Sequence, residues 1–234
     1  MDRHVEAFVR GDSPTECTPG FLQSRLELMK ETGCNLLVTG SVVPEVTFHA
    51  TRNLFGADQA KTPRQRLLAC TDLEPPANHY LLTGYEQPPE RVTTSGIERG
   101  VTTVDSPIDH TLTSQSGWLR SYQRNLCESI ADIDASVDGL EPSQFRLAFL
   151  TLRPILENDC SYEAGQFLRV VTDVVEGVSG MAHYHLPVAN ESPLVEECID
   201  HFDVQIQLRN PDGGAAETRW RFPDAETITP WHKL

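Results

Sequence analysis

The residues from Gly40 to Thr47 have the first and last members of a phosphate-binding loop but lack its middle members. Such a loop reads Gly, four residues, and then Gly-Lys followed by Ser or Thr. In this chain Glu45 and Val46 stand where the second Gly and the Lys belong. That Gly lets backbone amides curl around phosphate oxygens, and that Lys neutralises the terminal phosphates. The pattern therefore predicts a loop that has lost nucleotide hydrolysis.

The Glu45 carboxylate adds a repulsion to these losses. Two like unit charges near 4 Å repel each other by roughly 1 to 4 kcal/mol in wet surroundings, and a triphosphate multiplies this cost. A second interpretation is an ordinary strand followed by an amphipathic helix, in which Ser41 and Thr47 cap the helix and offer hydroxyls to a small anion. The candidate loop site in either case consists of Gly40, Ser41, Glu45, Val46 and Thr47.

His183 and His185 alternate along an apolar stretch, so both side chains are expected on one face of a strand. Two histidines leave a zinc site short of ligands, and the spacing supplies no third His, Cys or acidic partner. We therefore predict no metal site and expect half-buried, hydrogen-bonded histidines.

Other polar and aromatic residues give weaker indications. Trp231, near the end of the chain, is a candidate to seal a partner surface, with core packing as the alternative. The sequence has no Gly-x-Ser-x-Gly pattern, so it offers no hydrolase nucleophile of that type. Six arginines could converge on a sheet edge, although most are expected to be solvated or paired with acids: Arg52, Arg64, Arg66, Arg120, Arg124 and Arg153.

The elements that must position these residues alternate along the chain. Hydrophobic periodicity predicts helices at about 20–31, 44–55, 118–135, 162–176 and 193–202 and strands at 35–39, 66–72, 145–152, 181–188, 204–208 and 218–222. The last two strands flank a turn rich in Gly and Asp and predict a hairpin. The polar stretch 73–115 is expected to hold loops, with a short strand at about 102–105.

This alternation predicts an α/β fold, in which a mostly parallel sheet is sandwiched by helices and ends in an antiparallel hairpin. A chain of 234 residues is long enough for one such domain with a real core. We expect a partly flexible leader at 1–19 and a single domain at 20–234.

The composition is strongly acidic and poor in lysine. The chain has 34 Asp plus Glu against 19 Lys plus Arg, a formal charge of -15. Lys30, Lys61 and Lys233 are its lysines, so 16 of the 19 basic residues are arginine. The combination is typical of a high-salt cytoplasm, where the Debye length is about 3 Å at 1 M salt, and an acidic mesophilic protein is the alternative. The charge disfavours nucleic-acid binding, which depends on Lys and Arg contacts.

The cysteines indicate a reducing compartment. All six are scattered, with no pair closer than 17 residues and no Cys-x-x-Cys. The start of the chain lacks the pattern of a secretory leader, and no apolar run approaches the roughly 18 residues of a membrane span. We expect reduced thiols in a cytoplasmic protein that does not insert into a membrane.

The order of these pieces resembles the recombinase-type branch of P-loop nucleotide hydrolases, close to RecA-like, RadA-like and KaiC-like ATPase domains. The chain looks like a short form of these domains seen in halophilic archaea and is similar, in particular, to a haloarchaeal group of uncharacterised proteins with a transducer-like label. The matching stretches are 36–40, 180–188 and 219–224, and the resemblance covers about 20–234. It implies a RecA-like sheet with degenerate nucleotide motifs.

The resemblance also implies a place for magnesium, which such domains hold through an Asp at the end of an apolar strand. Here that strand ends in Thr151, with Arg153 two positions on, so the anionic ligand that magnesium prefers is absent. Asp72 ends a strand that comes too early in the order, and a turn or helix cap is its expected role. In related enzymes a residue at the position of His183 or His185 senses the terminal phosphate at the carboxyl edge of the sheet.

These features predict a non-catalytic pseudo-ATPase that acts as a regulatory or protein-interaction module in a halophilic archaeal cytoplasm. Recombinase-type domains pack head to tail, so the resemblance implies a protein partner or a homo-oligomer, with no cofactor. The alternative is a RecA-type enzyme that binds ATP and magnesium, or hydrolyses ATP slowly, through an atypical loop completed by a neighbour's Arg or Lys. A nucleic-acid-associated accessory protein is the third interpretation, which the charge of -15 disfavours.

Overall fold

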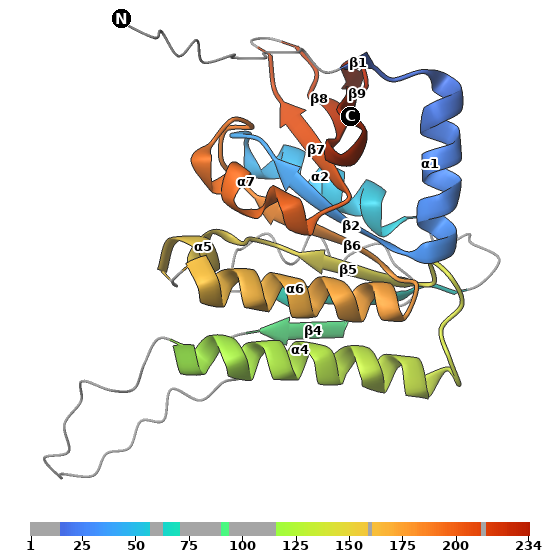
Figure 1. Ribbon diagram of the computed structural model, residues 1–234, viewed down its shortest axis with the longest axis vertical. Helices are drawn as coiled ribbons and strands as arrows, with labels where there is room; N and C mark the ends of the chain where they lie inside the picture. The colour runs from blue at the N-terminus through green and yellow to red at the C-terminus, as the bar shows by residue number, and fades with distance from the viewer. Residues whose placement is uncertain (1–14, 57–62, 71–89, 94–115, 159–160, 212–213) are drawn as a thin grey trace, which may run out of the picture.

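The structure, a computed structural model, describes residues 15–56, 63–70, 90–93, 116–158, 161–211 and 214–234 (Figure 1). The strands are β1 (Thr15–Glu16), β2 (Cys34–Thr39), β3 (Gln65–Cys70), β4 (Glu90–Thr93), β5 (Phe145–Phe149), β6 (Met181–Leu186), β7 (Val204–Arg209), β8 (Glu217–Phe222), β9 (Thr227–Ile228) and β10 (His232–Lys233). The α-helices are α1 (Pro19–Thr32), α2 (Pro44–Phe55), α4 (Ser116–Ser136), α5 (Arg153–Asn158), α6 (Ser161–Gly177) and α7 (Pro193–Cys198).

Six neighbouring strands form a parallel sheet in the order β7-β2-β6-β5-β3-β4. Strand β2 is central, with β6 on one side and β7 on the other. Every residue of β2 and β5 is buried, as parallel strands covered on both faces require. Beyond β7 the sheet continues with antiparallel β8, which pairs with β9 and β10, and β1 pairs with β9 at the far edge.

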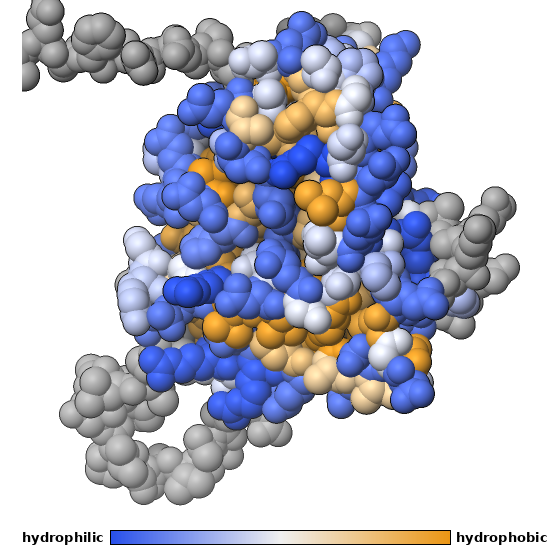
Figure 2. All heavy atoms as spheres, turned by 45° about the vertical axis from the view of Figure 1, so that its right-hand side comes forward, coloured by the Kyte–Doolittle hydropathy of each residue, from blue (hydrophilic) through white to orange (hydrophobic). Residues whose placement is uncertain are grey.

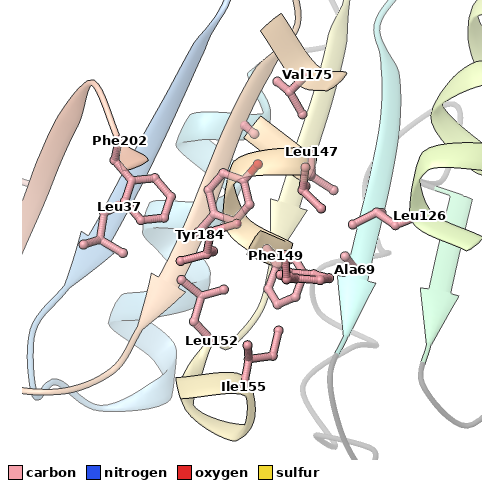
Figure 3. Packing of buried hydrophobic residues seen from close by; sticks show 14 of the residues in the cluster. Leu37, Ala69, Leu126, Leu147, Phe149, Leu152, Ile155, Val175, Tyr184 and Phe202 are labelled. Atoms are coloured by element: carbon pink, nitrogen blue, oxygen red, sulfur yellow. The ribbon is translucent and has the colours of Figure 1, made fainter. Parts of the chain in front are cut away.

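One side of the sheet, called the α6 face, is covered by α4, α5, α6 and α7. Figure 3 shows the core beneath them, where Tyr184 and Phe149 of the sheet lie beside Phe202, Leu152 and Ile155. The rings of Phe149 and Tyr184 stack with centroids 5.8 Å apart, and Tyr184 contacts Phe202 at 5.1 Å. This aromatic cluster fixes the helices against the parallel strands.

The opposite side, called the α2 face, is covered by α1 and α2. Val46 and Ala50 of α2 and Met29 of α1 pack on the alternate residues of β2 and β7. Farther along α2, Phe55 packs on β3 and β5. The connection that follows β2 therefore runs on the α2 face, whereas the connections that follow β5 and β6 run on the α6 face.

The structure confirms the predicted fold at the level of a mixed α/β chain with a mostly parallel sheet, flanking helices and antiparallel strands at the end. Helix α2 has the predicted bounds because Pro44 begins it and Gly56 ends it. The predicted hairpin is β7 and β8.

Several elements differ from the sequence prediction. Strand β4 lies inside the stretch predicted as loops, because its pairing with β3 supplies backbone hydrogen bonds that a polar sequence does not announce. Strand β1 lies within the predicted flexible leader and pairs with β9. Helix α5 was not predicted, and α7 is shorter than predicted because the chain tightens into a 3-10 turn at Ile199–His201. The predicted strand at 102–105 lies outside the described residues.

Hydrophilic side chains predominate on the face of the molecule drawn in Figure 2, and hydrophobic ones gather in a band at the height of α4 and α6. This surface agrees with the acidic composition. Among the residues that the structure describes, no helix has both the length and the apolarity of a membrane span.

Candidate functional site at the carboxyl end of the sheet

The candidate loop lies at a topological switch point of the sheet. Connections from neighbouring strands β2 and β6 run on opposite faces, and in open α/β sheets such a point is where ligands bind, outside the carboxyl ends of the strands. The loop from Gly40 to Val43 lies there, between β2 and α2. The structure thus places the loop site at the edge that a nucleotide fold would use.

Gly40 is packed closely between two strands. Its amide donates a hydrogen bond to the carbonyl of Val188, 2.9 Å away, at the end of β6. Its φ is 133°, and a Cβ added there would collide with the carbonyl oxygen of Leu208 on β7. Close packing and a left-handed backbone therefore require Gly at this position, whether or not phosphate is bound.

The first turn of α2 has little capacity to bind an anion. Pro44 stands at the first helical position and has no amide hydrogen. The amides of Val46 and Thr47 both donate to the carbonyl of Val43, at 3.0 and 3.5 Å. The exposed Glu45 carboxylate stands at the positive end of the helix dipole, where a phosphate would otherwise be attracted. The turn thus satisfies the amides of Val46 and Thr47 within the helix and supplies its own negative charge.

Val46 takes the place of the phosphate-binding Lys, and its side chain points into the protein. It is 9% exposed and belongs to the hydrophobic cluster of the α2 face. Ser41 is exposed and Thr47 is half-buried. The five loop residues of the sequence prediction therefore lie together between β2 and the first turn of α2, and the amides of Gly40, Val46 and Thr47 are already bonded within the protein.

His183 and His185 lie on one face of β6, as predicted, beneath α2. Their rings are 5.4 Å apart, and the ring of Phe55 lies 5.3 Å from that of His183. They are 2% and 1% exposed, so the expectation of half-buried histidines was wrong: α2 covers them fully. Neither ring is at an open sheet edge.

Hydrogen bonding and burial determine the protonation state of this pair. The Thr51 hydroxyl donates to the carbonyl of Thr47 at 3.0 Å, so His185 donates its Nε2 hydrogen to Thr51 at 2.9 Å. Burial lowers the pKa of His185 to about 3, and burial, then His185 and Arg146, lowers the pKa of His183 well below its usual value. Both rings are neutral near pH 7. Within the described residues, no group of three His, Cys, Asp or Glu side chains could hold a metal ion.

Thr151 and Arg153 act at the start of α5. The Thr151 hydroxyl accepts a hydrogen bond from the Arg153 amide at 3.3 Å, and Arg153 forms an ion pair with Glu157. A threonine that caps a helix offers magnesium no anionic ligand. Asp72 lies outside the described residues.

A buried polar network beside the loop was missed by the sequence analysis. Thr39, the last residue of β2, donates to the Asn190 side chain at 2.7 Å, and the Gln205 amide donates to Thr39 at 3.0 Å. Arg221 and Arg219 of β8 extend the network through Gln205 and Gln207. Alternating Gln residues on β7 and alternating Arg residues on β8 were the available signal. The network holds the end of β2 rigidly against β7.

The C-terminal tail packs beside this network. The guanidinium groups of Arg209 and Arg219 both lie over the ring of Trp231, 4.1 and 4.4 Å from its centroid. Arg209 also forms an ion pair with Glu217. Trp231 is thus engaged within the chain, which supports packing rather than a partner surface as its role.

A family model described as "Family of unknown function (DUF7504)" matches residues 33–208. The match extends from the start of β2 through most of β7, so it includes the loop, both histidines and Thr151. No curated protein matches the chain.

Proposed function

The chain belongs to this family of unknown function, and we propose that it is a non-catalytic module of regulation or protein interaction, built on a RecA-like and KaiC-like nucleotide-hydrolase scaffold. Its surroundings would be a high-salt cytoplasm, in keeping with the charge of -15 and the scarcity of lysine.

The topology supports the scaffold. The loop follows a central parallel strand and leads into a helix on one face, whereas the helices that precede and follow β6 lie on the other face. This arrangement, which ends in the antiparallel hairpin of β7 and β8, is what the resemblance to recombinase-type domains implies.

The closed first turn of α2 is the observation that most directly supports a non-catalytic role. A phosphate-binding loop needs free amides and a cation, and this turn has a proline, two amides bonded to Val43 and an exposed glutamate. Thr151, whose hydroxyl accepts the Arg153 amide and carries no negative charge, supports the same conclusion for magnesium. A triphosphate would meet repulsion and few donors.

Exposed apolar groups at the same sheet edge support a role in protein contacts. Val43, at the start of α2, is 50% exposed, and Tyr162, at the start of α6, is 74% exposed. Both helices begin at the carboxyl ends of the strands. Tyrosine and apolar residues that a monomer leaves exposed are the groups that protein interfaces bury.

Sedimentation velocity in molar KCl, together with affinity purification of the tagged chain from a high-salt extract, tests this proposal. We expect a self-assembly or a stoichiometric complex that Val43→Glu and Tyr162→Glu both weaken. Leu28→Glu is the matched control, because Leu28 is 47% exposed on α1, away from this edge. A monomer without a stoichiometric partner, or an assembly that all three variants leave intact, would overturn the proposed role of the edge.

A further inference from the structure

The β7–β8 hairpin has a polar surface on the α6 face. Alternate residues of β7 pack with α1 and α2, so the residues between them lie on the α6 face, and the hairpin register places three residues of β8 beside them. These cross-strand pairs are Gln205 with Arg221, Gln207 with Arg219 and Arg209 with Glu217. Among the described residues, the hydrophobic core of the α6 face includes none from β7 or β8. In Figure 1, α4 and α6 lie toward the β4 edge of the sheet and β8 lies toward the opposite edge.

Two arginines of this surface are held by buried glutamines. Nε of Arg219 donates to Oε1 of Gln207 at 2.6 Å, and Nη1 of Arg221 donates to Oε1 of Gln205 at 3.3 Å. Gln205 is completely buried and Gln207 is 4% exposed, whereas both arginines are half-buried. The other nitrogens of the two guanidinium groups are not among the buried atoms that lack a partner, so they are open to solvent. Each group therefore has a fixed position and N–H donors left for a ligand.

The C-terminal tail positions the third arginine. The guanidinium groups of Arg209 and Arg219 both contact the ring of Trp231. A guanidinium over an indole is held by attraction to the ring and needs no hydrogen bond there. Trp231 thus fixes two arginines of the surface, which agrees with its packing role.

The charges on this surface are three arginines and two glutamates. Arg209 forms its ion pair with Glu217. Burial lowers the pKa of Arg219, the nearby Glu191 raises it, and Arg209 and Arg221 lower it again. Neither Arg219 nor Arg221 forms an ion pair with another described residue. A chain with a formal charge of -15 therefore presents a locally positive surface here.

We propose that Arg209, Arg219 and Arg221 form a docking surface for an acidic segment of a protein partner, which lies extended along β8. Residues 219 and 221 are two positions apart on one strand, so they are spaced by about 7 Å. Alternate residues of an extended peptide have the same spacing. Carboxylates at alternate positions of the segment can therefore pair with both guanidinium groups, whose planar forks match carboxylate geometry.

A short acidic segment suits this surface better than a strand of nucleic acid. Proteins that bind single strands stack bases on aromatic rings, and the ring of Trp231 already contacts two guanidinium groups. A few carboxylates also carry less charge than a nucleic-acid strand, so the field of the acidic chain opposes them less. The surface uses neither Val43 nor Tyr162, so it is independent of the contacts proposed for the carboxyl edge.

Fluorescence anisotropy of labelled probes with the full chain in molar KCl tests this proposal. The first probe is a peptide of about ten residues in which Glu and Thr alternate, the second has Gln in place of each Glu, and the third is oligothymidylate of similar length. We expect saturable binding of the Glu peptide, at least about tenfold tighter than that of either other probe, equivalent to about 1.4 kcal/mol. No saturable binding of the Glu peptide, or equal binding of the Gln peptide, would overturn the proposal. Tighter binding of oligothymidylate would also overturn it and assign the surface to nucleic acid.

Variants locate the binding of the Glu peptide. Arg219→Gln and Arg221→Gln should each raise its Kd about tenfold, because each removes one fork. Arg153→Gln, in an exposed ion pair on α5, should bind like the wild type. Val43→Glu should do the same, so a failure of the carboxyl-edge contacts can be told from a failure of this surface. The proposal is wrong if the folded Arg221→Gln variant binds the Glu peptide as tightly as the wild type. If Arg219→Gln does not fold, Arg221→Gln decides alone.

Discussion

Gly40 shows at the scale of one residue how a motif position can have a packing role. Its backbone is left-handed, and its Cα faces the carbonyl of Leu208 at a distance that leaves no room for a Cβ. The same glycine begins the phosphate-loop pattern in the sequence. The survival of that residue is therefore weak evidence for phosphate binding, whereas the closed turn after it is strong evidence against.

Replacement of Gly40 by alanine should lower the free energy of unfolding by about 2 kcal/mol or more, because strain and overpacking add. Urea unfolding followed by circular dichroism measures the change. Gly117→Ala is the control, since a Cβ there meets nothing within 4 Å and the substitution favours a helix. Equal stabilities for the two variants would show that the approach of Leu208 does not constrain this position.

His183 and His185 make stability depend on pH. Both are neutral when folded, and His185 has a pKa of about 3 against an ordinary value of 6.5. Below pH 6.5 the unfolded chain therefore binds more protons than the folded one, and stability falls as the pH drops toward the folded pKa. The contribution of these two histidines to the free energy of unfolding is therefore fully present above about pH 6.5.

As the pH falls from 6.5 to 5, the free energy of unfolding should fall with a slope that approaches about 1.4 kcal/mol per pH unit for each histidine. Urea titrations at several pH values measure the slope, and His185→Gln should remove about half of it. His49→Gln, on the exposed side of α2, should leave the slope unchanged. A slope that persists in full in His185→Gln would refute this assignment.

At the scale of elements, α2 decides what the loop can do. The spacing of Val46 and Ala50 gives the helix a buried side, and that side faces β2 and β7. Position 46 is thus committed to the core by the same periodicity that forms the helix. A lysine there could not reach a phosphate without leaving the packed face.

Val46→Lys should therefore destabilise the protein by about 2 kcal/mol or more, because it buries an ammonium group without a partner. It should also fail to create nucleotide binding. Val43→Lys, at a position that is 50% exposed, should change stability by no more than about 0.5 kcal/mol. Chemical denaturation compares the two, and a stable Val46→Lys variant that binds ATP would contradict this view of α2.

Elements were predictable where one chain segment carries the whole signal. Strands β2 and β5 are short runs of mostly apolar residues, and α2 has Pro44 and Gly56 at its ends. The network of Thr39, Asn190 and Gln205 was not predictable, because its members come from separate segments and meet only through strand pairing. The burial of both histidines likewise depends on where α2 lies.

At the scale of the whole molecule, charge is distributed unevenly. Among the described residues no Asp or Glu is buried, whereas several arginines are placed inside the fold or beside its sheet edge, at Arg66, Arg146 and Arg219. Net charge from composition was sufficient to disfavour nucleic acid. It gave no sign of the interior arginines, since their positions follow from strand alternation and from the approach of α2.

The alternation of strands and helices was sufficient to predict the layered α/β fold. The identity of the proposed partner could not be predicted, because exposed residues such as Tyr162 follow no pattern that a single sequence reveals. The proposal of a non-catalytic module therefore depends most on the loop.

Calorimetric titration of the wild-type protein with ATP and ADP, with magnesium and in molar KCl, tests that proposal most directly. Glu45→Gln, which removes the carboxylate at the start of α2, and Glu27→Gln, on exposed α1, serve as the loop variant and its control. We predict no saturable binding tighter than about 1 mM for the wild type, equivalent to about 4 kcal/mol. Micromolar binding that Glu45→Gln strengthens and Glu27→Gln leaves unchanged would contradict the account and make the chain a nucleotide-binding protein.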